Sequence, residues 1–395
     1  MSGSVIVAGA RTPIGKLSGA LGTLPGTDLG GLAIAAALQR AGVSPDQVDY
    51  VFMGQVLQAG AGQITARQAA VKAGIPMVVP ATTINKVCLS GLNAIYLADQ
   101  MITSGDADIV VAGGMESMTK APYLLPGARA GYRIGDQQVV DAMMFDGLFC
   151  AFDVCAMGAG TEKYTVAVDG ITRERQDAFA ATSHERASAA MKEGRFADEI
   201  VPVSIPQRKG DPIVVETDEG VRPGTTPESL AGLRGAFAAD GTITAGNASQ
   251  ISDGGAALIV MSRAKADELG VTPLGEVLGY GQVAGPDASL LTQPSRAIGR
   301  ALGTAGMAIT DVDLFEINEA FAAVGIASMD DLGITEEDTN VNGGAISLGH
   351  PIGMSGARLA LTLLLELWRR GGGTGAAALC GGGGQGDALL VRSIA

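Results

Sequence analysis

The stretch ALQRAGVSPDQVD, residues 37–49, has a near copy in ALGTAGMAITDVD, residues 301–313. The two align without a gap at an offset of 264, and six of the 13 positions carry the same residue. A second pair, Ser90-Gly91 and Ser355-Gly356, matches at an offset of 265. Two matches at nearly one offset favour a duplicated unit, although two similar amphipathic helices remain the alternative.

Each copy predicts the same order of elements: helix, short turn, strand, then a glycine-rich turn into another helix and strand. The first helices end near Gly42 and Gly306, and short strands follow at residues 51–53 and 314–317. Two small apolar runs, 108–112 and 375–379, are typical of strands buried on both faces. We therefore expect a layered α/β fold built from two related halves.

The chain between the copies differs from them in composition, which predicts an insertion. Residues 119–249 hold 13 of the 27 basic residues, and proline and charge interrupt them often. The apolar run at 256–261 predicts a strand that returns to the first sheet. We thus expect an N-terminal half at 1–118 with 250–270 returning to it, an insertion at 119–249, and a C-terminal half at 271–395.

Composition excludes several classes of partner. The 395 residues carry 27 Lys and Arg against 41 Asp and Glu, a net charge of −14, and aromatic residues make up 4%. Such an acidic chain repels phosphate backbones and lacks stacking platforms, so we expect no nucleic acid and no membrane partner. An anionic substrate remains possible where basic side chains gather locally.

Cysteine and histidine usage narrows the chemistry further. The four cysteines contain no Cys-x-x-Cys pair, and His184 and His350 have no soft ligand nearby, so we expect no metal site. Few cysteines in a long chain fit a reducing compartment. The N-terminus lacks a signal-peptide pattern, and no apolar stretch is long enough to span a bilayer. We expect a cytoplasmic protein.

Cys88 is the first candidate nucleophile. It lies in Asn85-Lys86-Val87-Cys88-Leu89-Ser90-Gly91, just before a helical pattern. Unpaired amides at a helix N-terminus stabilise a thiolate and can receive an oxyanion. A buried, inert cysteine is an equally common outcome.

His350 is the candidate base. Three glycines and a proline surround it in Gly349-His350-Pro351-Ile352-Gly353-Met354-Ser355-Gly356, which predicts a tight loop at a helix start. The offset of 265 places His350 opposite Asn85 and Gly353 opposite Cys88. Packed, related halves would bring both loops to one crevice, where a thiol and an imidazole form an activated nucleophile. A structural histidine holding a turn is the alternative.

Cys380 opens a glycine run, Cys380-Gly381-Gly382-Gly383-Gly384-Gln385-Gly386. The run contains G-x-G-x-x-G, but a strand rather than a helix follows it, so we do not expect a dinucleotide site. The glycines instead allow close backbone approach around Cys380. Cys150 and Cys155 are expected to be packing residues, and His184 a surface residue.

Together these motifs resemble the thiolase family, and within it the acetyl-CoA acetyltransferases. The resemblance runs from Val5 to the C-terminus and includes seven motifs in order. These are the residues at 7–13, the Cys88 segment, 113–118, 244–249, 318–322, 342–356 and the Cys380 loop. It implies the thiolase fold: two duplicated βαβαβαββ halves in five layers (α/β/α/β/α) plus an inserted loop domain.

The resemblance also implies roles for individual residues. Cys88 would accept the acyl group as a thioester, with His350 as the base that activates it. Asn318 would hold a water at the oxyanion site that His350 shares. Cys380 would move the proton at the acetyl methyl, and the amides of Cys88 and Gly382 would form a second oxyanion site.

By the same resemblance coenzyme A would lie under the insertion, and no metal or redox cofactor is needed. Its expected contacts are Leu148, Met157, Arg222, Ser229, Phe237, Ala245, Ser249, Ala320 and Phe321. Two departures concern the acyl pocket: relatives often have His-Met-Gly where this chain has Ala156-Met157-Gly158, and Met-Gly near Leu290-Leu291.

The implied activity is the reversible condensation of two acetyl-CoA to acetoacetyl-CoA and CoA. The alternatives are a broader-chain 3-ketoacyl-CoA thiolase of β-oxidation and a non-catalytic acyl-CoA carrier. Ketoacyl synthases share the fold but lack a second reactive cysteine in a terminal glycine loop. The segment from Tyr123 to Asp141 resembles a loop that joins dimers, which implies a homotetramer.

Overall fold

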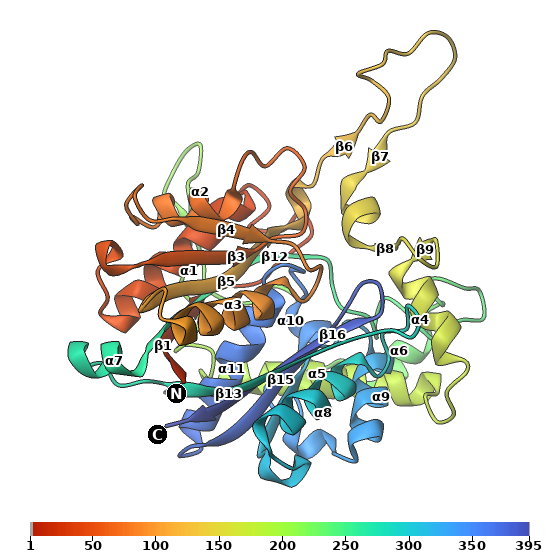
Figure 1. Ribbon diagram of the computed structural model, residues 1–395. Coiled ribbons are helices and arrows are strands. Elements are labelled where there is room, and N and C mark those ends of the chain that lie inside the picture. Colours follow the sequence, from red (N-terminus) through yellow and green to blue (C-terminus); the bar gives the residue numbers. More distant parts are fainter. Residues whose placement is uncertain (1–2, 395) are drawn as a thin grey trace.

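A computed structural model describes residues 3–394 of the chain, and its centre is one large mixed sheet (Figure 1). The strand order is β14-β15-β16-β13-β1-β12-β5-β3-β4, with β2 attached to β12. The strands are β1 (Ser4–Arg11), β2 (Gly15–Lys16), β3 (Tyr50–Gly54), β4 (Ala81–Ile84), β5 (Ile109–Ser117), β12 (Ser252–Ser262), β13 (Gly275–Ala284), β14 (Leu314–Ile317), β15 (Gly373–Gly381) and β16 (Gln385–Ser393).

The sheet is built from two halves with the same strand order and polarity. In one half β3 pairs parallel with β5, and β12 follows antiparallel and pairs with β1. In the other half β14 pairs parallel with β15, and β16 follows antiparallel and pairs with β13. The halves meet where β1 pairs with β13 over only two positions, Val5 with Glu276 and Ile6 with Gly275. This arrangement is the duplication that the sequence predicts.

Helices complete five layers around these halves. On the outer face of the N-terminal half lie α1 (Gly26–Ala41) and α2 (Thr65–Lys72), and on that of the C-terminal half α8 (Gln293–Ala305) and α9 (Ala322–Leu332). Between the halves lie α3 (Ser90–Ser104) and α11 (Ser355–Arg369), which pack on each other and on both sets of strands. The core divides accordingly into a central cluster and two outer clusters.

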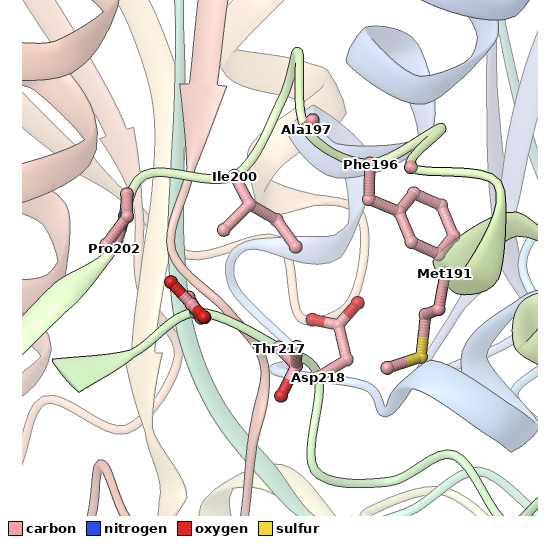
Figure 2. Close-up of a pocket in the computed structure, with 9 residues that line it drawn as sticks. Met191, Phe196, Ala197, Ile200, Pro202, Thr217 and Asp218 are labelled. Atoms are coloured by element: carbon pink, nitrogen blue, oxygen red, sulfur yellow. The ribbon is translucent and has the colours of Figure 1, made fainter.

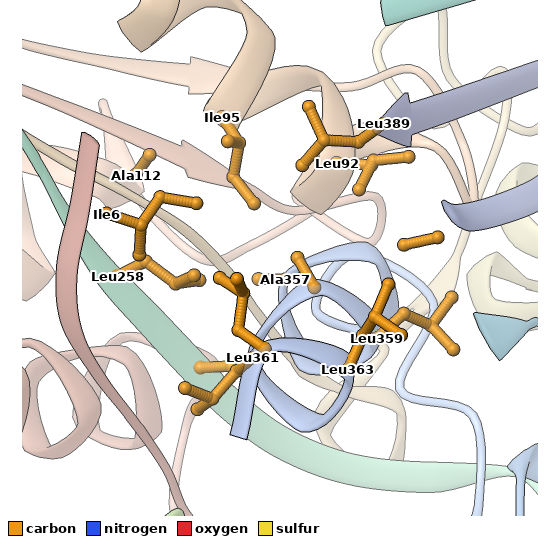
Figure 3. Close-up of a cluster of buried hydrophobic side chains, with 14 of the residues drawn as sticks. Ile6, Leu92, Ile95, Ala112, Leu258, Ala357, Leu359, Leu361, Leu363 and Leu389 are labelled. Carbon is orange, nitrogen blue, oxygen red and sulfur yellow. The ribbon is translucent and has the colours of Figure 1, made fainter. Parts of the chain in front are cut away.

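The central cluster is the layer that positions the two helix starts. Figure 3 shows the leucines of α11 between strand residues of the first half, such as Ile6 and Leu258, and Leu389 of the second. Leu92 and Ile95 of α3 approach the same space. Burial of apolar surface on this scale is the main force that holds the halves together.

The residues that end the first helix of each half also match. Both α1 and α8 end at a glycine in the left-handed conformation, Gly42 with φ +64° and Gly306 with φ +66°. Only glycine adopts this conformation without a steric penalty, so it closes the helix and returns the chain to the sheet. Both helix ends were predicted from sequence and are confirmed.

The segment between the halves folds over one end of the molecule, and an extended hairpin of this segment projects from the body (Figure 1). Its strands and helices are β6 (Tyr123–Leu124), β7 (Val140–Asp141), β8 (Phe149–Cys150), β9 (Cys155–Ala156), α4 (Met157–Thr165), α5 (Arg173–Lys192), β10 (Val203–Ile205), β11 (Ile213–Val215) and α6 (Pro227–Ala231). Two further short helices, α7 (Arg263–Leu269) and α10 (Ala345–Leu348), lie outside this segment. Short 3-10 turns at Pro45–Gln47, Met118–Lys120, Ile309–Asp311 and Glu336–Asp338 and a π turn at Met143–Gly147 complete the backbone. Across residues 3–394, every helix is too short or too polar to cross a lipid bilayer.

Candidate active site

The starts of α3 and α11 approach each other closely in the central layer. A Cβ at Gly91 would lie 2.9 Å from the amide nitrogen of Ala357, and one at Gly356 would overlap the amide nitrogen of Leu92. These two glycines are the repeat-equivalent positions, so glycine at both is what permits the crossing. The loops that precede the two helices, with Cys88 and His350, therefore meet at one place.

Cys88 sits on a tight turn held by Ser90. The hydroxyl of Ser90 accepts a hydrogen bond from the amide of Lys86 (2.8 Å) and donates one to the carbonyl of Val87 (2.6 Å). Val87 has φ +51°, a left-handed conformation that is strained for a β-branched residue. The turn leaves Cys88 half-buried against the apolar cluster of Val56, Leu57, Met118 and Ile352.

Burial distinguishes between the two states that the sequence leaves open for Cys88. Burial raises the pKa of the thiol to about 12, the carboxyl of Glu116 adds to the rise, and the amide of Cys88 itself opposes it. Helix α3 begins two residues later, at Ser90, and its N-terminus does not offset the desolvation. Of the two alternatives that the sequence leaves open, the raised pKa favours a buried thiol over a stabilised thiolate, so Cys88 would need a base to react.

His350 is held in one tautomer by Ser355. The hydroxyl of Ser355 donates its single proton to the carbonyl of Pro351 (3.0 Å) and lies 2.6 Å from Nδ1 of His350. With the proton of Ser355 on the carbonyl of Pro351, the hydroxyl accepts from Nδ1–H and Nε2 is the basic nitrogen. The donor group Nδ2 of Asn318, which faces Nε2, favours the same tautomer. Burial lowers the pKa of His350 to about 3, and the charge of Arg358 lowers it further. The imidazole is neutral, with Nε2 free to accept a proton.

Asn318 contacts this basic nitrogen. It follows β14 and is fully buried, and its backbone N–H donates to the carbonyl of Ala378 (2.9 Å). The side-chain Nδ2 of Asn318 lies 3.4 Å from Nε2 of His350. Its Oδ1 is buried without a hydrogen-bond partner among the described residues. Asn318 and His350 together thus present a polar pair in otherwise apolar surroundings.

Cys380 lies at the end of β15, beside the turn that carries Cys88. A Cβ at Gly381 would come 2.6 Å from Cγ of Leu89, and one at Gly382 would be 3.4 Å from Cγ1 of Val87. The glycine backbone after Cys380 therefore runs past the residues on both sides of Cys88. Burial raises the pKa of the Cys380 thiol strongly, and the neighbouring Cys88 adds to the rise.

An apolar cavity of about 350 Å³ leads to His350. It is lined by six residues predicted to contact coenzyme A: Leu148, Met157, Phe237, Ala245, Ser249 and Phe321. Ala156 and Ile352 also line it, and Ala320 is buried nearby in the cluster that contains Cys380. Arg222 and Ser229 lie outside this lining, exposed on the segment that leads into α6 and on α6 itself.

His184 is buried rather than on the surface. Only 3% of it is exposed, and its Nδ1 accepts a hydrogen bond from the amide of Arg222 (3.1 Å). The sequence prediction fails because α5 is covered by α6, α9 and α10, which are distant in sequence. Burial lowers the pKa of His184 to about 4. A neutral imidazole therefore anchors the backbone that carries Arg222.

The other two cysteines face each other across a small hairpin. Cys150 pairs with Cys155 in the β8–β9 ladder, and the thiol of Cys150 accepts a hydrogen bond from the amide of Asp153 (3.3 Å). Cys150 is buried, as expected of a packing residue, and Cys155 is half-buried. The next ladder pair is Phe149 with Ala156, so this hairpin forms one wall of the apolar cavity.

A separate hollow of about 350 Å³ lies away from the cysteines (Figure 2). Met191, Phe196, Ile200 and Asp218 point into it, and no cysteine or histidine is among its described lining residues. Beneath it the buried guanidinium of Arg11 binds Asp218 (2.7 Å) and Glu199 (2.8 Å). These contacts of Arg11 join the insertion to β1, so the role of Arg11 is structural.

The sequence matches two family models, the thiolase N-terminal domain over residues 4–264 and the thiolase C-terminal domain over residues 271–393. The chain belongs to the thiolase family. This thiolase is 60% identical over 388 residues to a probable acetyl-CoA acetyltransferase of Mycolicibacterium smegmatis, covering 98% of this chain and all of the relative. It is 53% identical over 393 residues to the acetyl-CoA acetyltransferase of Cupriavidus necator, covering 99% of this chain and all of the relative.

The fold of this thiolase has a similarly complete match. The crystal structure of the Bacillus anthracis acetyl-CoA acetyltransferase superposes with a TM-score of 0.97 at 41% identity. The match covers all of this chain and 99% of the other. The prediction of a thiolase fold is confirmed.

Sequence reasoning missed Ser355 as a support of the site, whereas the strand end at residues 113–117 was expected to support it, and Glu116 is the residue through which it does so. Ser355 was visible as half of the repeated Ser-Gly pair, although its hydroxyl could not be linked to His350 without the loop's path. The carboxyl of Glu116 accepts hydrogen bonds from the amides of Val56 (2.9 Å), Leu57 (3.2 Å) and Gly353 (3.0 Å). It thereby ties β5 of this thiolase to the His350 loop, and burial raises its pKa to about 7.

Proposed function

We propose that this thiolase is an acetyl-CoA C-acetyltransferase that condenses two acetyl-CoA to acetoacetyl-CoA and CoA, reversibly and by a ping-pong mechanism. The observation that carries the proposal is that the loops with Cys88, Cys380 and the His350–Asn318 pair come together, and that His350 lines an apolar cavity. A single nucleophile would suffice for acyl transfer alone. A second buried thiol beside it supports carbon–carbon bond formation.

In the first half-reaction, the sulfur of Cys88 attacks the carbonyl carbon of acetyl-CoA while its proton passes to Nε2 of His350. The pKa directions require these events to be coupled, because the resting pair is a thiol and a neutral imidazole. The C–S bond to CoA then breaks, and the imidazolium returns the proton to the leaving thiolate. The product is an acetyl thioester on Cys88.

In the second half-reaction, the resting Cys380 thiol first gives its proton to Nε2 of His350, and the Cys380 thiolate then removes a proton from the methyl group of a second acetyl-CoA. The negative charge moves to the thioester oxygen, where His350 and Asn318 stabilise it. The carbon then attacks the acetyl group on Cys88, whose developing oxyanion the amides of Cys88 and Gly382 receive. Cleavage of the C–S bond releases acetoacetyl-CoA, and the leaving Cys88 thiolate takes the proton from the His350 imidazolium, so that both cysteines end as thiols and His350 as a neutral imidazole.

The acyl group is proposed to be short. Cys380 is 1% exposed and packs in one cluster with Leu290, Leu291 and Met157, so little apolar space surrounds it. We propose acetyl-CoA, acetoacetyl-CoA and CoA as the substrates, and no cofactor. Arg222 and Ser229 would contact the exposed end of the CoA moiety. The division of the chain into 1–118 with 250–270, 119–249 and 271–395 is proposed from the strand pairing, in which β12 returns to β1 and β5 while β13 pairs with β16.

The test is CoA-dependent cleavage of 3-ketoacyl-CoA esters, with acetoacetyl-CoA and a longer homologue compared in one experiment. We expect rapid turnover confined to acetoacetyl-CoA, and none with Cys88→Ala. Preference for the longer ester would instead support the broader-chain thiolase of β-oxidation, with Ala156 and Leu290 as the permissive positions. Binding of acyl-CoA without cleavage of either ester would support the carrier alternative and overturn the proposal.

A homotetramer is proposed from the projecting hairpin. Tyr123, Leu125, Ile134 and Val139 of this hairpin are exposed apolar residues, and Ile134 is 95% exposed. Such residues away from the body of a protein are typical of contact surfaces. Light scattering should give four times the chain mass, and a stable monomer would contradict the proposal.

A further inference from the structure

A charged network outside the CoA cavity joins the two cysteine-bearing loops. The ammonium of Lys86 lies 2.8 Å from both carboxyl oxygens of Asp387 and 2.8 Å from Oε1 of Gln282. The hydroxyl of Tyr280 donates to Asp387 as well (2.6 Å), and its ring stacks on Tyr96 of α3 with centroids 4.4 Å apart. The network therefore connects the Cys88 turn, β16, β13 and α3.

Each end of the central ion pair is next to a reacting cysteine. Lys86 precedes Cys88 by two residues, on the strained turn. Asp387 pairs with Leu379 in the β15–β16 ladder, and the adjacent pair is Cys380 with Gly386. On its other side Asp387 pairs with Gln282 of β13. One ion pair thus spans the short distance between the turn that carries one thiol and the hairpin that carries the other.

The arrangement around the Lys86 ammonium has a defined geometry beyond simple charge attraction. An ammonium has three N–H donors, and here three acceptor oxygens surround it. The side chain of Asp387 is 0% exposed and that of Lys86 is 20% exposed. Buried ion pairs of this kind often add little stability compared with apolar residues, because desolvation offsets the attraction. What such a pair does supply is a fixed direction and distance between the two segments.

We propose that Lys86 and Asp387 are positioning residues that hold the Cys88 turn against the Cys380 hairpin for the carbon–carbon bond-forming step. The inference rests on the proposed function, in which only the second half-reaction uses both thiols. Acylation of Cys88 depends on His350, whose loop the ion pair does not touch. Loosening the pair should therefore impair condensation far more than acylation.

The magnitude follows from the sensitivity of such steps to geometry. A displacement of a reacting group by about 1 Å can reduce a rate by roughly 100-fold. We therefore expect Lys86→Met/Asp387→Leu, which removes both charges together, to lower kcat for condensation by about 10- to 100-fold. The KM for acetyl-CoA and the rate of Cys88 acetylation should stay within about threefold, because the cavity and His350 are unchanged.

The experiment measures both half-reactions on the full chain. Acetylation of Cys88 by acetyl-CoA is followed by the burst of released CoA and by intact mass, and condensation by steady-state kcat and KM. Lys265→Met, which removes the ion pair with Glu268 on α7, is the matched control and should change neither. Lys86→Arg, which keeps the charge, should retain most of the condensation rate that the double variant loses.

A second variant covers the case in which the double variant fails to fold. Gln282→Leu removes one of the three acceptors, and we expect it to show the same pattern at smaller size. Equal loss in both half-reactions, or full condensation by a folded double variant, would overturn the inference. Because the unmodified chain is assayed alongside, a wild-type protein without thiolase activity would refute the proposed function instead, and the two failures are distinguishable.

Discussion

Substitution of Ser355 by alanine is the most direct test of the proposal that His350 acts as a base. Ser355 is 1% exposed, and its hydroxyl is the acceptor that keeps the proton on Nδ1. Alanine leaves Nδ1–H buried without this acceptor, which costs about 1–3 kcal/mol. It also frees the ring to adopt the tautomer with hydrogen on Nε2, which cannot take the proton of Cys88. At about 1.4 kcal/mol for each tenfold change, kcat/KM for thiolysis should fall by roughly 5- to 150-fold.

Ser188→Ala provides the matched control for this substitution. Its hydroxyl is also buried and donates to the carbonyl four residues earlier, that of His184 (2.7 Å), as Ser355 donates to Pro351. Both variants should lose a similar amount of thermal stability, and only Ser355→Ala should lose activity. The assay is the initial rate of CoA-dependent acetoacetyl-CoA cleavage at pH 7.5. A folded Ser355→Ala enzyme within twofold of wild type would refute the tautomer argument.

Three further predictions follow from the same geometry. Gly158→Ala should raise KM for CoA esters with little change in kcat, because a Cβ there would overlap the ring of Phe237 in the cavity wall; an unchanged KM would contradict this. Cys380→Ser should still acetylate Cys88, seen by intact mass, and fail to condense; equal loss of both steps would argue against separate roles. Folding holds His184 neutral with a pKa of about 4 against an ordinary value of 6.5, so the unfolded chain binds more protons between these values and stability falls as pH drops through them. His184→Asn should therefore lose less thermal stability than wild type between pH 7 and pH 5, and equal losses would refute the assignment.

The parts of the fold that depend on local chemistry were predictable from sequence. Gly42 and Gly306 end their helices because the left-handed conformation favours glycine wherever it occurs. The repeated Ser-Gly pairs likewise marked the crossing of α3 and α11, because only glycine permits backbones to approach so closely. The residue types of the site were equally visible, since a cysteine or a histidine in a rigid glycine loop is recognisable from its neighbours alone.

The protonation states and long-range contacts of those residues were not predictable, because they depend on segments that are distant in the chain. Lys86 and Asp387 are 301 positions apart, and only the assembled sheet brings them together. Cys88 precedes a helix, which locally favours a thiolate, yet its pKa rises because other segments of the chain bury it and Glu116 lies nearby. His184 looks like a surface residue in its own helix until α6, α9 and α10 cover that helix. Sequence motifs thus indicate which side chains meet at the candidate site of this thiolase, while burial by the rest of the chain determines which of them hold a proton at rest. Under the proposed function, this is why the neutral Cys88 thiol needs the neutral imidazole of His350 beside it.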